Sequence, residues 1–558
     1  MNKIKEYLIV LTIYLLLTLI LTYPLIVHFT THIAGNGGDG WQNVWNMWWM
    51  KKALMDMHTN PYYTDYLFQP TGSTLIFQTM NPFNAVLSIP LQYAFNLVIT
   101  YNVIFVMSFM LCGFSMYLLA LHITNNKFAS LVAGFIFCFS PYHMAHGLGH
   151  LQLVSMQFIP LFILYLIKMT EEGGSDRHAI TASVFLVLVA LCDWYYLFFC
   201  FMFLALFVIH TAWMRRFDFK ILVKRAAIVF ALTFLALSPY FIAMIKEATT
   251  NIIIGAHSPE NSPPNLLSFF IPNPILTIGR SVDFFRIASG SFIRNQLENS
   301  NYMGYCVLFL SLYAFIKLRK KNPIVNLLLL SGVIFFILSL GMHLHVGGKE
   351  FRNIPLPYNF LYKTVFFFKF TGVPARFDVM LVVSLSLLAA LGLKELFVIR
   401  NWLKRRIVVG AGIFFIFIEY LAVPFGINFT GIPQFCRDMA KDPSDYTVIA
   451  VSNRSKALYY QTIHNKKMFG GYISRQPLHT EEYLKSMPVI SDIIYNRYPM
   501  KIKGRLVSQA DAEKLVRSIF KTLNIKYVLV LNKEKNRFLE GYQFKNIYKD
   551  NDLKVFIP

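Results

Sequence analysis

Apolar runs of about 20 residues recur along this chain and limit what it can fold into more than any other feature. The runs begin at Tyr7 and continue to Gly426, and a helix of that length crosses the roughly 30 Å hydrocarbon core of a bilayer. The composition agrees, because 56% of the 558 residues are hydrophobic and 15% are charged, against about 45–50% and about 25% in soluble domains. The sequence therefore predicts an α-helical polytopic membrane protein.

About 11–12 membrane helices are expected within a membrane domain of residues 1–427. The predicted spans are 7–27, 101–122, 128–141, 151–168, 179–192, 195–213, 225–245, 302–318, 324–340, 377–397 and 406–425. The first span lacks a small-residue cleavage site, so we expect it to remain as an anchor. The segment 83–97 is also apolar, but Pro82 and Pro90 interrupt it, and we interpret it as an interfacial or re-entrant helix.

The positions of lysine and arginine predict the orientation. Basic residues gather in three short connectors, at 215–225, 317–321 and 400–406. Because such connectors are retained in the cytoplasm, we expect them, together with Lys3 and Lys5, on the cytoplasmic side of the membrane. Parity then predicts that the long loops lie outside, and these are 28–81, 246–301 and 342–375. The tail after residue 427 is also predicted to be extracytoplasmic.

The tail, residues 428–558, differs in composition from the rest of the chain. Basic residues outnumber acidic ones, and strand-like apolar runs occur at 446–451 and 527–531. Residues 510–523 have a helical pattern, with acidic residues early and basic residues late, which complements a helix dipole. We expect a small soluble α/β domain.

Charge and motifs exclude several classes of function. The net charge of +23 is explained by basic side chains at helix ends, where they set topology and meet anionic lipid headgroups, so no nucleic-acid partner is expected. None of the six cysteines forms a CxxC pair. The sequence contains no P-loop, GxSxG, HExxH or Rossmann motif, which argues against an ATP-driven pump or a soluble-type hydrolase.

The first outer loop contains a glycine-flanked carboxylate, Asp39. Glycine on both sides allows the backbone to come close to a ligand, and the carboxylate can bind a cation or accept a proton from a hydroxyl. The alternative is that Asp39 only caps the following helix. Gln42, Asn43 and Trp45 follow as candidate substrate-binding residues. The local tryptophans otherwise form an interfacial anchor.

Three histidines follow at spacings of three and four residues, His143, His146 and His150. On one continuous helix these spacings place the imidazoles along one face, provided that Gly147 and Gly149 do not break the helix. Such a trio suits a divalent metal or a phosphate. Ordinary hydrogen bonding at the membrane interface is the alternative.

Further ionisable residues occur at predicted outer helix ends. Asp193 lies between two apolar runs beside Tyr195 and Tyr196, a costly position that makes it a candidate for function, although headgroup water at a helix turn also explains it. Glu298 offers another carboxylate. Arg376 can clamp a phosphate bidentately or extend towards headgroups.

The motifs together resemble the GT-C superfamily of polytopic glycosyltransferases, and within it the bacterial YfhO-like membrane proteins. The residues that carry the resemblance are Gly38–Asp39–Gly40 with Gln42, Asn43 and Trp45; 60–61; 69–70; 140–152; 270–274; 302–304; 374–377; 461–462; and 470–472. Each motif is weak by itself, but together they span most of the chain.

This resemblance implies transfer of a sugar from a polyprenyl-phosphate-linked donor to a glycan, lipid or protein acceptor of the cell envelope. It also implies a divalent cation in many members and a first-loop acid as catalytic base, a role that falls on Asp39. GT-C enzymes often carry two nearby acids in that loop, whereas Asp39 has glycine neighbours. Asp193 and Glu298 are therefore the candidates for a partner carboxylate, and Arg376 or the histidines for phosphate binding.

Two other functions are compatible with the sequence. A transporter or flippase of a lipid-linked glycan also needs ionisable groups in a membrane bundle, but transporters usually place them near the midplane and show paired repeats. The second alternative is a non-catalytic accessory protein for envelope assembly. The ionisable residues predicted at the outer face favour the enzyme.

Overall fold

The computed structural model describes residues 3–215, 217–255, 257–292, 295–365, 368–369, 371–399, 401–502, 504–531 and 534–558. Arg216 and Arg400, which contributed to the predicted orientation, lie outside these residues. The described residues form two compact units. We call residues 1–30, 101–238 and 257–427 the helical unit, and residues 31–100, 239–256 and 428–558 the mixed unit.

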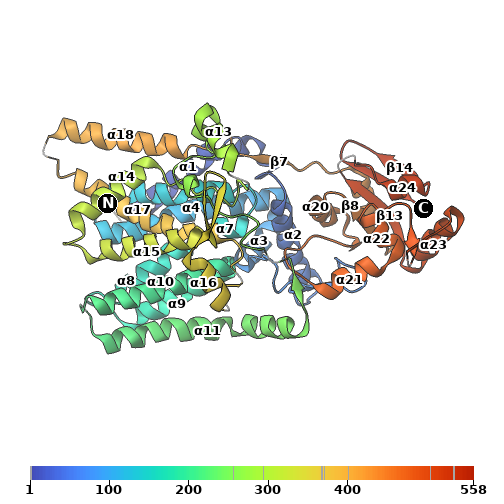
Figure 1. The fold of residues 1–558 in the computed structure, drawn as a ribbon, viewed down its shortest axis with the longest axis horizontal. Helices are drawn as coiled ribbons and strands as arrows, with labels where there is room; N and C mark the ends of the chain where they lie inside the picture. Colours follow the sequence, from blue (N-terminus) through green and yellow to red (C-terminus); the bar gives the residue numbers. More distant parts are fainter. Residues whose placement is uncertain are drawn as a thin grey trace. The chain divides into compact units, whose positions relative to one another are not determined.

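The helical unit is built mainly from α-helices (Figure 1). Its principal helices are α1 (Lys3–Leu21), α4 (Leu97–Thr124), α5 (Lys127–Cys138), α6 (Pro141–His146), α7 (Leu151–Val154), α8 (Phe158–Lys168), α9 (Asp176–Cys192), α10 (Trp194–Trp213), α11 (Phe219–Thr250), α14 (Tyr305–Leu318), α15 (Pro323–Ser339), α17 (Asp378–Leu396) and α18 (Trp402–Tyr420). Its smaller elements are η1 (Leu25–His28), η3 (Leu266–Phe269), α12 (Thr277–Ser281), α13 (Asp283–Phe292), β5 (His343–Val346), β6 (Lys349–Pro355), α16 (Pro357–Thr364) and η5 (Pro374–Phe377).

Helix α17 forms the centre of the helical unit. It packs against α5, α14 and α15, and nearly all its side chains are buried. A Cβ atom at Gly392 would overlap the backbone carbonyl of Leu310, so glycine at this position lets α17 approach α14 closely. Close approach through small residues is a common way for helices to associate in lipid, where the hydrophobic effect between helices is absent.

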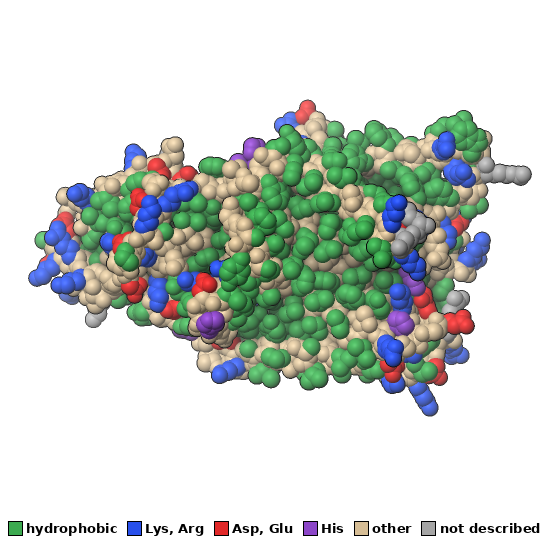
Figure 2. All heavy atoms as spheres, turned by 180° about the vertical axis from the view of Figure 1, so that it is seen from behind, with side chains coloured by type: hydrophobic (Ala, Val, Ile, Leu, Met, Phe, Trp, Pro, Cys, Tyr) green, Lys and Arg blue, Asp and Glu red, His purple; other side chains and the backbone are tan. Residues whose placement is uncertain are grey.

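The outer surface of the helical unit is suited to a bilayer. Within the described residues, seven helices are long and apolar enough to span a membrane. Large apolar side chains lie exposed along α11, including Phe230, Phe234 and Leu235, and Figure 2 shows hydrophobic side chains over a broad area of this unit. Contiguous exposed apolar side chains are typical of a surface that contacts lipid or another protein. The chain is a multi-pass membrane protein, as predicted, while the total of about eleven crossings and the orientation stay predictions.

The apolar segment 83–97 forms helix α3 (Pro82–Ala94) in the mixed unit. Its 13 residues give a length of about 20 Å, which is shorter than the roughly 30 Å hydrocarbon core. The side chain of Asn81 caps its first turn by accepting a hydrogen bond from the backbone of Asn84. The length favours the interfacial interpretation.

The mixed unit contains a five-stranded sheet in the described part of the tail, in the order β14-β15-β13-β8-β9. The strands are β8 (Thr447–Val451), β9 (Lys467–Phe469), β13 (Ile525–Leu531), β14 (Lys545–Lys549) and β15 (Leu553–Ile557). Strands β13, β8 and β9 are parallel, and β15 is antiparallel to β13 and β14. The predicted sheet and helix of the tail are confirmed within one to two residues at most ends.

Helices of the mixed unit cover this sheet and the first outer loop. They are α2 (Asp39–Lys51), η2 (Lys52–Asp56), α19 (Gln434–Lys441), α20 (Arg454–His464), α21 (Leu478–Ser486), α22 (Pro488–Ile494), α23 (Gln509–Thr522) and α24 (Arg537–Gly541). Short strands are β1 (His32–Ala34), β2 (Tyr63–Thr64), β3 (Ser73–Thr74), β4 (Ile253–Ile254), β7 (Ile427–Phe429), β10 (Gln476–Pro477), β11 (Lys501–Ile502) and β12 (Arg505–Leu506). Helix α2 packs against α3 and α20. The first outer loop therefore folds together with the tail. The predicted boundary at residue 427 instead assigned this loop to the membrane domain.

Candidate functional site

The predicted site residues fall into two groups. Asp39, Gln42, Asn43 and Trp45 belong to the mixed unit. The helical unit contains the others, which are Asp193, Tyr195, Tyr196, Glu298, Arg376, His143, His146 and His150.

Asp39 is the first residue of helix α2. The preceding residues Gly37 and Gly38 have positive φ angles, of 84° and 58°, which only glycine adopts easily. A Cβ atom at Gly37 would lie 2.8 Å from Nε1 of Trp41. The helix cap is Gly38, so the interpretation of Asp39 as the N-cap is wrong. Its carboxylate still lies in the first turn of α2, at the positive end of the helix dipole.

The Asp39 carboxylate binds a tyrosine from the tail. The phenol of Tyr472 donates a 2.6 Å hydrogen bond to Oδ1 of Asp39. Burial raises the pKa of Tyr472, and the neighbouring carboxylate raises it further, so the phenol stays protonated and remains a donor. Tyr472 lies in the loop that follows the carboxyl end of β9, after Gly470 with a φ of 81°. The sequence resemblance includes Tyr472, but nothing in it indicated this partner.

The other polar side chains of α2 have defined partners. Gln42 accepts hydrogen bonds from the hydroxyls of Thr79 (3.3 Å) and Ser474 (3.1 Å). The amide of Asn43 donates to the backbone carbonyl of Asp39 (2.9 Å). Gln42 and Asn43 are therefore part of the framework that holds the start of α2.

Trp45 has a packing role. Its ring is fully buried and stacks on Trp49 at 5.6 Å between centroids, and its indole N–H donates to Oε1 of Gln461 (2.8 Å). Trp41 is also buried and stacks on Tyr459. These rings join α2 to α20, so an exposed interfacial anchor does not describe Trp41 or Trp45.

In the helical unit, Arg376 and Glu298 form a buried ion pair. The guanidinium of Arg376, in η5, binds both carboxylate oxygens of Glu298, with Nε 3.2 Å from Oε2 and Nη2 bonded to Oε1. Burial by itself would raise the pKa of Glu298, but the guanidinium holds that pKa well below its ordinary value. The arginine fork predicted to bind phosphate is thus occupied by Glu298.

Aromatic and polar side chains surround this ion pair. The guanidinium of Arg376 lies 4.9 Å from the ring centroid of Tyr195, a favourable cation–π distance. Tyr196 donates to the backbone carbonyl of Leu153 (2.7 Å). Asp193 caps α10 by accepting hydrogen bonds from the backbone N–H groups of Tyr195 (2.8 Å) and Tyr196 (3.3 Å).

The three residues after Glu298 are buried and polar. Asn299, Ser300 and Asn301 each have a side-chain oxygen with no hydrogen-bond partner among the described residues. A buried polar atom without a partner costs about 1–3 kcal/mol. A polar ligand that reaches this segment would relieve the cost. Asn299 and Ser300 were not among the predicted site residues, because only their position in the outer loop distinguished them.

The three histidines do not form one metal site. His143 has Nδ1 2.5 Å from the carbonyl oxygen of Cys138 and Nε2 2.9 Å from that of Val154, so both its nitrogens are occupied. His146 and His150 lie together, with 3.0 Å between their Nδ1 atoms. The predicted trio is wrong because α6 ends at His146 and the helix does not continue to His150. Among the described residues, no three His, Cys, Asp or Glu side chains are placed to hold a metal ion.

His150 belongs to the ion-pair cluster instead. Its Nε2 atom lies 4.0 Å from Oε1 of Glu298. The helical unit therefore brings together six of the predicted residues, and they are Glu298, Arg376, Tyr195, Asp193, His146 and His150.

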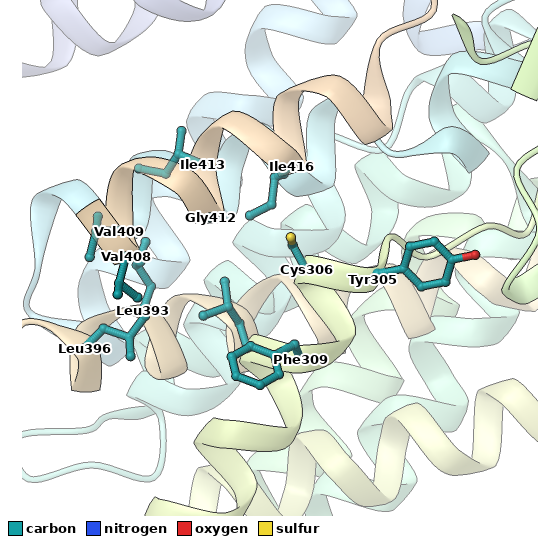
Figure 3. Close-up of a pocket in the computed structure, with 11 residues that line it drawn as sticks. Tyr305, Cys306, Phe309, Leu393, Leu396, Val408, Val409, Gly412, Ile413 and Ile416 are labelled. Atoms are coloured by element: carbon teal, nitrogen blue, oxygen red, sulfur yellow. The ribbon is translucent and has the colours of Figure 1, made fainter. Parts of the chain in front are cut away.

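An apolar cavity of about 270 Å³ lies between α14, α17 and α18. Figure 3 shows Phe309, Leu393, Val409 and Ile413 around it, with Gly412 leaving the α18 wall open. The lining is almost wholly hydrocarbon, so the cavity suits an alkyl or isoprenoid chain better than a polar headgroup.

Comparison with known proteins identifies the family. The chain belongs to the family described as "Domain of unknown function (DUF6311)", whose model matches residues 9–423. None of the curated protein sequences matches the chain. The narrower likeness to YfhO-like proteins is not confirmed by these matches.

Solved structures with a similar fold include oligosaccharyltransferases and ArnT. Apo oligosaccharyltransferase from Archaeoglobus fulgidus is 13% identical with a TM-score of 0.52, over 94% of this chain and 70% of that one. AglB from the same organism, in complex with an inhibitory peptide and a dolichol-phosphate, is 15% identical with a TM-score of 0.50, over 95% and 70%. ArnT from Cupriavidus metallidurans, bound to undecaprenyl phosphate, is 9% identical with a TM-score of 0.51, over 98% and 97%. The chain has a GT-C fold.

Proposed function

We propose that this DUF6311 protein is a membrane glycosyltransferase that moves a sugar from a polyprenyl-phosphate-linked donor to an acceptor of the cell envelope. The GT-C fold supports this class of reaction, and so do the lipid phosphates named with its structural neighbours, dolichol-phosphate and undecaprenyl phosphate. The apolar cavity beside α14 offers room for a hydrocarbon chain. Absence of a nucleotide-binding motif fits a donor that is lipid-linked.

The observation that carries the proposal is the way Asp39 is held. A carboxylate that acts as general base needs a fixed orientation and access to the acceptor proton. The glycine turn and the Tyr472 phenol orient Asp39 at the start of α2, and its side chain remains partly exposed. In the proposed step the acceptor O–H loses its proton to Asp39, and its oxygen attacks the anomeric carbon. The bond from that carbon to the phosphate oxygen breaks, and polyprenyl phosphate leaves.

Within the helical unit, the Arg376 cluster has the chemistry to bind a phosphate group. Arg376 can exchange Glu298 for a phosphate, because its planar fork matches either group bidentately. The unpaired oxygens of residues 299–301 can accept hydrogen bonds from sugar hydroxyls.

Transfer of labelled sugar in membranes that carry the full chain tests the proposal. Several polyprenyl-phosphate sugars would be offered, and Asp39→Asn compared with Asp56→Asn, a more exposed aspartate of the same unit that pairs only loosely with Lys51. We expect transfer by the wild type and by Asp56→Asn, and its loss in Asp39→Asn. Equal transfer by both variants would rule out Asp39 as the base. No transfer from any donor, with Asp39→Asn normal in cells, would favour the accessory or transporter role.

A chelator arm tests for a divalent cation separately. One oligosaccharyltransferase structure from Archaeoglobus fulgidus was solved in complex with Zn and sulfate, whereas the described residues of this chain offer no three-ligand group. No step of the proposed reaction passes through a metal. Loss of transfer after chelation, with recovery on addition of a divalent cation, would show that the reaction requires a metal. The substrate would then supply some of the ligands of that metal.

A further inference from the structure

Three buried amide side chains lie together in the mixed unit, next to the Asp39–Tyr472 pair. Gln42 and Asn46 come from one face of α2, three and seven residues after Asp39. Gln78 comes from the segment before α3, and all three are less than a tenth exposed. We call these three residues the amide cluster. Among them only Gln42 was a predicted site residue.

Two hydroxyl residues hold the amide cluster together. Ser474 donates its backbone N–H to Oε1 of Gln78 (2.8 Å) and its hydroxyl to Oε1 of Gln42 (3.1 Å). Thr79 donates its hydroxyl to Oε1 of Gln42 (3.3 Å) and accepts a hydrogen bond from the Asn46 amide at its backbone carbonyl (2.9 Å). Three segments distant in sequence therefore meet at this point.

Each amide keeps one polar atom without a hydrogen-bond partner among the described residues. These atoms are Nε2 of Gln42, Oδ1 of Asn46 and Nε2 of Gln78. The orientation of Gln78 is fixed, because a backbone N–H must meet its oxygen, and that of Asn46 is fixed by a backbone carbonyl. Gln42 meets only hydroxyls, so an amide flip exchanges its free atom but still leaves one free. The cluster thus offers at least one donor and one acceptor.

We infer that the amide cluster is a binding subsite for the hydroxyl groups of a neutral sugar or polyol. A hydroxyl both donates and accepts, so it satisfies the free N–H of Gln78 and the free oxygen of Asn46. Buried polar atoms are almost always paired, so three free ones on hydrogen-bonded neighbours indicate a missing polar partner. Identification of this ligand as the acceptor whose proton Asp39 removes rests on the proposed function, whereas the subsite itself does not.

Saturation-transfer NMR on the purified full chain in lipid nanodiscs tests the inference without any need for turnover. The probes are methyl glycosides, N-acetylglucosamine and inositol, each beside an analogue in which hydroxyls are replaced by hydrogen. The first variant is Gln78→Glu, which keeps the oxygen that Ser474 binds and removes the free N–H group. Gln78→Met removes the whole amide at similar volume. Gln434→Glu changes an exposed glutamine of the same unit and is the matched control.

We expect at least one probe to bind the wild type and Gln434→Glu, and its deoxy analogue to bind more weakly. Loss of one hydrogen bond predicts about tenfold weaker binding in both Gln78 variants. The inference is overturned if no probe binds the wild type, or if a folded Gln78 variant binds as the control does. Hydroxyl-dependent binding without any sugar transfer would refute the proposed reaction and support the subsite. Sugar transfer with an unchanged acceptor KM in both Gln78 variants would support the proposed reaction and refute the subsite.

Discussion

Substitution of Glu298 by glutamine leaves the guanidinium of Arg376 buried without its carboxylate. The side chains of the two residues are 7% and 6% exposed, respectively, and they meet through two hydrogen bonds. Removal of one partner of a buried pair costs about 3–5 kcal/mol, because the remaining charge has neither water nor a counter-ion. We expect Glu298→Gln to lower the free energy of unfolding of the helical unit by that amount.

Unfolding in detergent, followed by intrinsic fluorescence, measures this loss through a double-mutant cycle. The double variant Glu298→Gln with Arg376→Gln removes both charges, so it should recover much of the loss seen in the single variant. Glu350→Gln breaks an exposed pair with Arg352 and should change stability by less than about 1 kcal/mol. A Glu298→Gln loss no larger than that of Glu350→Gln would refute a desolvated ion pair.

Acid sensitivity gives a second measurement of the same pair. The pKa of Glu298 is lower in the folded chain than its ordinary value of 4.5, so ionisation of Glu298 favours the folded state. That stabilisation is complete above about pH 4.5 and is lost as the pH falls towards the lowered folded pKa. The stability difference between the wild type and Glu298→Gln should therefore shrink below about pH 4.5, and a constant difference would contradict the assignment.

Three further predictions follow from other contacts. Tyr472→Phe removes a hydrogen bond to the Asp39 carboxylate and should lower the rate of sugar transfer by about tenfold to a hundredfold, from about 1.5–3 kcal/mol, as measured in the labelled-sugar assay. Gly392→Ala places a methyl group against the carbonyl of the neighbouring helix and should destabilise the chain by about 1–3 kcal/mol in thermal unfolding, unlike Gly410→Ala, where no described atom lies within 4 Å. Burial lowers the pKa of His464 to about 3, so its neutral form favours folding; the mixed unit should lose stability as pH falls from about 6.5 towards 3, and His464→Gln should weaken that dependence in acid unfolding.

Matched substitutions separate these effects from a non-specific loss of folding or stability. Tyr498→Phe alters a more exposed tyrosine of the same unit and should leave sugar transfer unchanged. His479→Gln, at an exposed position of α21, is the matched control for His464→Gln. Equal effects in a variant and its control would contradict the contact that the prediction uses.

The fold class follows from the sequence because local pattern determines it. Apolar runs longer than the bilayer thickness can satisfy their backbone only as helices, and alternating apolar residues in the tail can be recognised as strands. The GT-C likeness of the whole chain is confirmed, and so is the sheet of the tail. The grouping of residues 31–100 with the tail was missed, because it depends on contacts such as that of Trp45 with Gln461, which no local pattern encodes.

The candidate site was partly predicted for the same reason. Asp39 stands out because glycines flank it, Asp193 because an ionisable residue between apolar runs is costly, and Arg376 because a guanidinium at a helix end can bind phosphate. Tyr472, the partner of Asp39, and Ser474, the partner of Gln42, carry no such signal, since a tyrosine or a serine in a loop is ordinary. The histidine trio failed because helical spacing holds only within an unbroken helix, and α6 ends at His146.

The hydrogen bond between Asp39 and Tyr472 also sets the order of events during synthesis. The two residues are 433 positions apart, and at about 5–20 residues per second a ribosome needs about 20–90 s to travel from one to the other. During that time the first outer loop has already left the ribosome while the loop that orients its carboxylate does not yet exist. Asp39 acquires its tyrosine only after synthesis has passed β9, so a chain that stops short of β9 never holds an oriented Asp39.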